Sequence, residues 1–158
     1  MSLRLVFASA ALLAALALPA SAQSPPSATG VWNFATAELN DSCTISGEMT
    51  LKSAPAKTAK AFSCSFKAVQ SCKGGVIRTI HTQQSCIATQ TGAQVVITSK
   101  LEKVESVDPP ALMAGMDKRY APDNFDVTIN TAGDEMIGKF ESMGRAPVKF
   151  QRKQELVS

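Results

Sequence analysis

The sequence predicts an all-β domain, an eight-stranded antiparallel up-and-down β-barrel stapled by disulfides. Three observations predict it: apolar and polar residues alternate in eight short segments, mostly turn-forming residues connect these segments, and all four cysteines lie between positions 43 and 86. Period-two alternation is typical of a strand with one buried face. Closing eight such strands into a barrel buries the apolar faces and removes exposed edges. A two-sheet β-sandwich is the alternative architecture.

The N-terminus has the pattern of a cleaved signal peptide over residues 1–22. Arg4 precedes an apolar run, and Ala20-Ser21-Ala22 has the small residues that signal peptidase accepts. We therefore expect a periplasmic or secreted protein in an oxidising compartment. No later stretch approaches the roughly 20 apolar residues of a membrane-spanning helix, so we expect no membrane anchor.

Residues 23–29 are polar and proline-rich, which predicts a flexible N-terminal arm before a single barrel domain over residues 30–158. The first strand covers Gly30 to Phe34, with Trp32 and Phe34 on one face. The formal net charge is +3, and the basic residues are dispersed. This distribution argues against a nucleic-acid partner.

The stretch from Cys43 to Cys86 predicts three neighbouring strands. Apolar residues alternate with polar ones from Cys43 to Lys52 and again from Phe62 to Ala68. Lys73-Gly74-Gly75 is a turn signal, and the β-branched run from Val76 to Thr82 predicts the next strand.

Four cysteines allow three disulfide connectivities, which the sequence alone does not separate. Antiparallel neighbours pair symmetrically about their turn, and Cys64 and Cys86 are equidistant from Gly75. Cys43 and Cys72 are centred on the connection between the second and third strands. We favour these two pairs. The chain has no C-x-x-C and a single histidine, so we expect no metal site.

The second half of the chain supplies the remaining strands. Alternation from Val95 to Glu102 predicts the fifth strand, and the irregular segment 105–124 follows it. Three strands then close the domain: residues 125–129, 136–140 and 148–152. The irregular segment carries the candidate binding loop, made of Leu112, Met113, Met116 and Tyr120, and we expect any pocket to lie beneath it at the barrel mouth.

Gly30-x-Trp32 on the first strand and Arg152 at the end of the last strand resemble the barrel-closing arrangement of the calycin superfamily. This group includes lipocalins, avidins and small periplasmic metalloprotease inhibitors. The resemblance implies that Trp32 packs across the barrel floor with the Arg152 guanidinium over its indole, where it gains a cation–π contact.

The chain is similar to the inhibitors in three further respects: the signal peptide, the arm before Gly30-x-Trp32, and Cys43 opening the second strand. That resemblance implies a Cys43–Cys64 bridge and an arm that enters a protease cleft. The sequence departs from the family in its second cysteine pair and in the long segment 105–124.

These features favour an exported, non-enzymatic binding module, of protein-interaction or inhibitor type. The sequence has no H-E-x-x-H, no G-x-S-x-G and no phosphate-binding glycine loop, so we expect no enzyme and no cofactor. A small apolar ligand bound at the barrel mouth, as in a lipocalin, is the alternative. Bulky inward side chains argue against a roomy interior.

Overall fold

The computed structural model describes residues 24–40, 42–53 and 61–154, so the predicted signal peptide and Gln23 lie outside the described residues. This part of the chain forms eight strands and two short helical turns. The strands are β1 (Gly30–Thr36), β2 (Cys43–Ser53), β3 (Ala61–Cys72), β4 (Thr79–Thr91), β5 (Gln94–Asp108), β6 (Asn124–Ile129), β7 (Glu135–Glu141) and β8 (Arg145–Arg152). The turns are a 3₁₀-helix, η1 (Pro110–Leu112), and α1 (Met116–Arg119).

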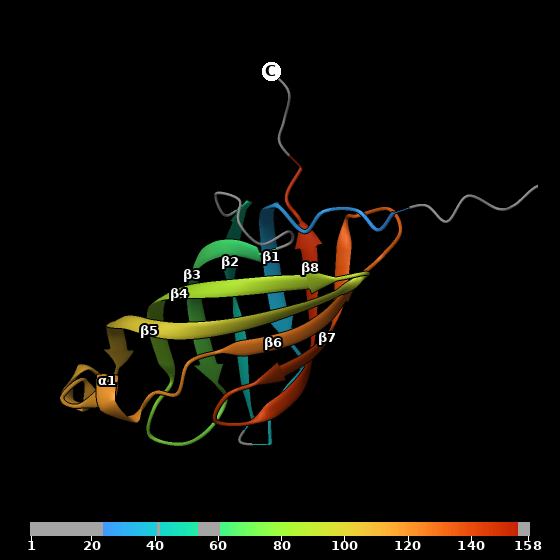
Figure 1. Cartoon of the computed structure of the whole chain (residues 1–158). Coiled ribbons are helices and arrows are strands. Elements are labelled where there is room, and N and C mark those ends of the chain that lie inside the picture. The colour runs from blue at the N-terminus through green and yellow to red at the C-terminus, as the bar shows by residue number, and fades with distance from the viewer. Residues whose placement is uncertain (1–23, 41, 54–60, 155–158) are drawn as a thin grey trace, which may run out of the picture.

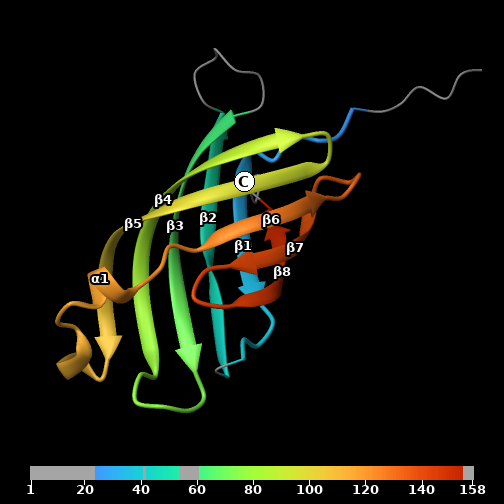
Figure 2. The same cartoon turned by 60° about the horizontal axis from the view of Figure 1, so that its bottom comes forward.

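The strands form a closed antiparallel barrel in sequence order (Figure 1). β8 pairs with β1, where Trp32 lies opposite Arg152 and Phe34 opposite Phe150. The predicted up-and-down barrel is therefore confirmed over the sandwich. We call the end where β1 begins and β8 ends the floor, and the opposite end, which carries η1, α1 and the β3–β4 turn, the mouth (Figure 2).

The barrel interior is filled by its own side chains. Five phenylalanines form a chain of edge-on, tilted and stacked ring contacts, with centroids 5.2–5.9 Å apart. They are Phe34, Phe66, Phe125, Phe140 and Phe150. Trp32 and Met49 are fully buried beside them. Because inward positions alternate with outward ones, the period-two pattern identified these core residues from the sequence.

Two disulfides staple the wall at β3. Cys43 is bonded to Cys72 across β2 and β3, and Cys64 to Cys86 across β3 and β4. In both pairs the two residues lie directly opposite each other in the strand register. This is the pairing that symmetrical turns favoured.

The mouth ends of β4 and β5 differ from the sequence expectation. β4 begins at Thr79 and not at Val76, and β5 continues to Asp108. The register of β5 against β4 skips Glu102 and Glu105, so the inward positions after Leu101 are three residues apart. These irregularities break the alternation on which the prediction depended, and such bulges bend a strand.

A second apolar cluster lies at the mouth, outside the main core. η1 and α1 pack on the mouth end of β5, and the cluster consists of Ile80, Val104, Val107, Met116 and Tyr120, with Ile77, Leu101 and Leu112 against it. The segment that the sequence predicted to be irregular is therefore a short helical loop with its own buried face.

The disulfides indicate an oxidising environment of the kind found outside the cytoplasm. Among the described residues, every helix is too short or too polar to cross a bilayer.

Candidate functional site

The barrel floor is closed by Trp32 and Arg152. The guanidinium carbon of Arg152 lies 4.3 Å from the centroid of the Trp32 ring, and the indole N–H donates to the Ala28 carbonyl at 2.9 Å. This is the arrangement that the calycin resemblance implied. A guanidinium over an indole gains electrostatic attraction from the ring face.

Arg152 also holds the N-terminal arm. Its guanidinium donates to the carbonyls of Ser27, Thr29 and Gly133. In Figure 1 the arm crosses the barrel at this end, close to the end of β8. Gly133, at φ 76°, faces the ring of Pro26, so a side chain there would collide with the arm.

The side chain of Gln90, on β4, also forms hydrogen bonds with the N-terminal arm. Its amide nitrogen donates to the Pro26 carbonyl at 2.8 Å, and its oxygen accepts from the Ala28 N–H at 3.1 Å. Ala28 is fully buried. Residues 26–29 have no regular secondary structure, and these hydrogen bonds attach their backbone to the barrel floor.

One feature implied by the inhibitor resemblance is different in the structure. Cys43 is bonded to Cys72 and not to Cys64. The backbone of residues 26–29, the second half of the predicted arm, is bound to the chain's own barrel.

The mouth carries an open hollow of about 790 Å³, which we call the mouth hollow. It is lined by the β1–β2 connection, the start of β2, the end of β3, the β3–β4 turn, the start of β4, α1 and the β7–β8 turn. Its apolar walls are the Cys43–Cys72 disulfide, Val76, Ile77, Ile80, Met116 and Met143. A smaller space of about 130 Å³ adjoins it and ends against Ile45 and Phe140. The filled interior lies below.

Among the described residues, two cations line the mouth hollow, Lys73 and Arg119, and both have hydrogen-bond or ion-pair partners. Lys73 forms an ion pair with Glu38 at 2.6 Å. The Arg119 guanidinium donates to the carbonyls of Leu112, Ala114 and Gly115 and so braces its own loop. Because both cations have partners, the mainly apolar walls of the hollow carry few unpaired charges.

The four residues of the predicted binding loop occupy different places. Met116 is buried and lines the mouth hollow, and Tyr120 is buried in the second apolar cluster. Leu112 packs against that cluster, and Met113 is 39% exposed. The loop therefore contributes one wall of the hollow through Met116 and Arg119.

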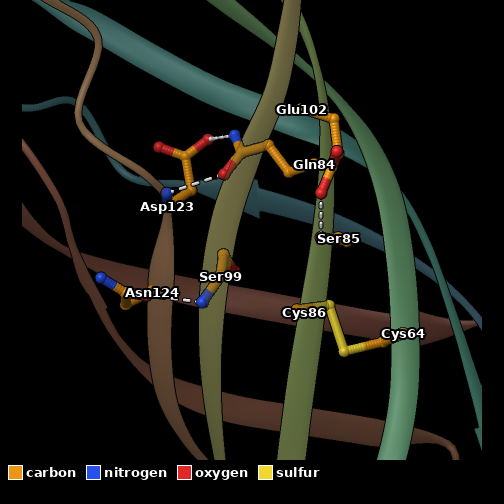
Figure 3. The surroundings of a disulfide bond; sticks show 8 residues. All are labelled: Cys64, Gln84, Ser85, Cys86, Ser99, Glu102, Asp123 and Asn124. Carbon is orange, nitrogen blue, oxygen red and sulfur yellow. Dashed lines mark hydrogen bonds between the residues drawn. A yellow bond between two sulfur atoms is a disulfide. The ribbon is translucent and has the colours of Figure 1, made fainter.

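A buried polar cluster joins this loop to the barrel wall. The Gln84 amide donates to the Asp123 carboxylate at 2.6 Å, and its oxygen accepts from the Asp123 N–H at 2.9 Å (Figure 3). The same amide nitrogen also donates to Thr82 Oγ1 at 3.1 Å. The Tyr120 hydroxyl donates to the same carboxylate at 3.0 Å. Ser142, in the β7–β8 turn, faces it from the third side. Asp123 is fully buried.

The carboxyl of Asp123 is surrounded by neutral groups. Burial raises its pKa to about 6, because desolvation outweighs the hydrogen bonds from Gln84, Tyr120 and Ser142. Burial and the neighbouring carboxylate raise the pKa of the Tyr120 hydroxyl well above its ordinary value. The cluster thus contains an acid that titrates near neutral pH.

Sequence reasoning missed this cluster, although one signal was available. Thr82 and Gln84 occupy inward positions on β4, between the apolar residues Ile80 and Ala88. Buried polar side chains require partners, so such residues indicate an internal network. Their partner Asp123 could not be found from the sequence, because it comes from a loop with no periodic pattern.

The other residues with reactive side chains, His81 and the cysteines, are not part of this polar cluster. His81 alternates with the inward residues of β4 and lies opposite Val69 and Ser106 on neighbouring strands. All four cysteines are in disulfides. Within the described residues, no three His, Cys, Asp or Glu side chains are grouped so that they could hold a metal ion.

Comparison with known proteins gives one distant structural likeness. No protein-family model and no curated protein matches the chain. A redesigned β-barrel, mFAP1, solved bound to DFHBI, superposes with a TM-score of 0.48 and 10% sequence identity, over 79% of this chain and 94% of that one. A similarity this distant assigns neither a family nor a function.

Proposed function

We propose that the chain is an exported, non-enzymatic binding module that takes a small apolar ligand in the mouth hollow. The observation that carries the proposal is the hollow itself, which has a volume of about 790 Å³ and mainly apolar walls. Small-molecule sites commonly have volumes of roughly 300–1,000 Å³ and a predominantly apolar lining.

The packing of the barrel supports binding at the mouth and not inside. The phenylalanine chain and Trp32 occupy the interior, so a ligand that entered would have to displace core side chains. Such displacement costs several kcal/mol, of the order measured for core substitutions. The Cys43–Cys72 disulfide stiffens one wall of the hollow and favours a preformed site.

A protein partner is the second candidate, and the rim of the hollow favours it. Val76 is 73% exposed and Met143 is 67% exposed, and both line the hollow. Exposed apolar side chains beside a recess are suited to receive a side chain of a partner. Contact through the rim has better support than insertion of the arm, because Arg152 and Gln90 bind the arm's own backbone.

The experiment is titration with Nile red, a neutral apolar dye, followed by fluorescence. We expect saturable binding to the wild type and a loss of at least about tenfold in affinity in the Val76→Glu, Met143→Glu double variant. Both side chains are exposed, so the substitutions leave the core unchanged.

Ile137→Glu is the matched control, because Ile137 is 53% exposed on β7 and does not line the hollow. It should bind the dye as the wild type does. Absence of saturable binding, or equal losses in the control and the double variant, would contradict the small-ligand proposal. A partner captured by the wild type and lost by the double variant would then favour the rim as a protein-binding surface.

A further inference from the structure

We propose that Asp123 is a pH-sensitive latch that fastens the loop 109–123 to the barrel, and that this loop opens more readily when the carboxyl is ionised. The inference concerns regulation of the mouth hollow and so deepens the proposed function. Its test reads the loop directly and does not need a ligand.

The geometry makes Asp123 the connection between three elements. Gln84 reaches it from β4, Tyr120 from the loop itself, and Ser142 from the β7–β8 turn. The Ser142 hydroxyl lies beside the carboxyl and donates its single proton to the Ala121 carbonyl at 2.8 Å. The last residues of the loop are therefore held by hydrogen bonds that meet at or beside one carboxyl group.

The loop is less firmly attached elsewhere. Its buried apolar side chains are Met116 and Tyr120, packed on Ile80, Val104 and Val107 outside the main core. Segments with few buried apolar contacts open locally before the whole domain unfolds. Release of Asp123 would also free the wall that Met116 and Arg119 contribute to the mouth hollow.

Among the described residues, no buried cation faces the Asp123 carboxyl. The groups that face it are Gln84, Thr82 behind it, Tyr120 and Ser142. One of these groups, Tyr120, has a titratable side chain, and burial raises the pKa of its hydroxyl, which therefore stays protonated. An ionised carboxylate enclosed by neutral donors is destabilised relative to water, so hydration through loop opening relieves it.

The size of the effect follows from linkage. The pKa of the carboxyl is about 6 when the loop is closed, against an ordinary value of 3.8. A difference of about two pKa units changes the opening equilibrium about 100-fold across the range from pH 4 to above pH 6. The loop opens least below pH 4 and most above pH 6.

The test is hydrogen exchange of backbone amides, read for residues 113–124 and for β1 and corrected for the intrinsic pH dependence of exchange. In the wild type, loop protection should fall about 100-fold from pH 4 to pH 7. Asp123→Asn, which cannot ionise, should remove this fall. Asp126→Asn, an exposed carboxylate on β6, is the matched control and should behave as the wild type.

The Tyr120→Phe variant gives a second measurement, the pH midpoint of the protection change. This midpoint would not shift if Asp123 had only a structural role. The Tyr120 hydroxyl lowers the pKa of the Asp123 carboxyl, so its removal should shift the midpoint of the protection change to higher pH. The latch is overturned if loop protection is constant from pH 4 to pH 7, or if Asp123→Asn keeps the wild-type profile. It is also overturned if the loop amides are protected as strongly as the β1 amides at every pH, because both then exchange through unfolding of the whole barrel.

Discussion

The substitution Arg152→Met tests how much the contacts at the barrel floor stabilise the fold. Methionine retains much of the apolar stem over Trp32 but removes the guanidinium. The change eliminates one cation–π contact at 4.3 Å and the shared donor of three backbone carbonyls. Two of these carbonyls belong to the arm, at Ser27 and Thr29.

The magnitude can be bounded from these contacts. A cation–π contact contributes about 0.5–2 kcal/mol, and a hydrogen bond from a charged group about 1.5–3 kcal/mol when it is buried. Arg152 is partly exposed, so water replaces part of each hydrogen bond and the sum must be discounted. We expect Arg152→Met to lower the free energy of unfolding by about 2–4 kcal/mol.

Urea unfolding followed by the fluorescence of Trp32, the single tryptophan, is the assay. Arg145→Met is the matched control, since Arg145 begins the same strand, is 83% exposed and has one ion pair with Glu141. The control should unfold close to the wild type. If Arg152→Met also unfolds with the wild type, the floor contacts do not stabilise the barrel and the reasoning is refuted.

Three further predictions concern the wall and the buried acid. Because the pKa of Asp123 is raised from 3.8 to about 6 on folding, the unfolding free energy should fall by about 2–3 kcal/mol as pH rises from 4 to 7, and Asp123→Asn should abolish this fall in urea titrations. Gly138→Ala places a methyl group against the Asp126 carbonyl and 2.6 Å from Val127 Cα, so thermal unfolding should show a loss of about 3 kcal/mol. Removing both Cys43 and Cys72, which are 29 residues apart, should cost about 3–4 kcal/mol in oxidised protein, whereas equal stability would contradict the chain-entropy account.

The main core could be predicted from the sequence because the physics there is local. A strand with one buried face alternates with period two, and that rule located residues such as Phe34, Phe66 and Phe150. The disulfide pairing followed from a second local rule, that antiparallel neighbours pair symmetrically about their turn. Cys64 and Cys86 are equidistant from the turn at Gly75.

The mouth was harder to predict because its structure depends on contacts between distant segments. The skipped residues Glu102 and Glu105 change the spacing of buried positions on β5, and alternation carries no signal for them. Asp123 and Gln84 form a hydrogen bond although they are 39 positions apart in the sequence. The bound state of the arm depends on Arg152, more than 100 positions away, and its composition alone indicates only disorder.

The most direct test of the account is chemical-shift mapping of a neutral apolar probe such as Nile red on ¹⁵N-labelled protein. The account predicts shifts confined to the mouth, at the amides of Gly74, Val76, Ile77 and Met116, with the floor amides around Trp32 unchanged. Shifts centred on the floor, or on core amides such as those of Phe34, would contradict a filled barrel that binds at its mouth.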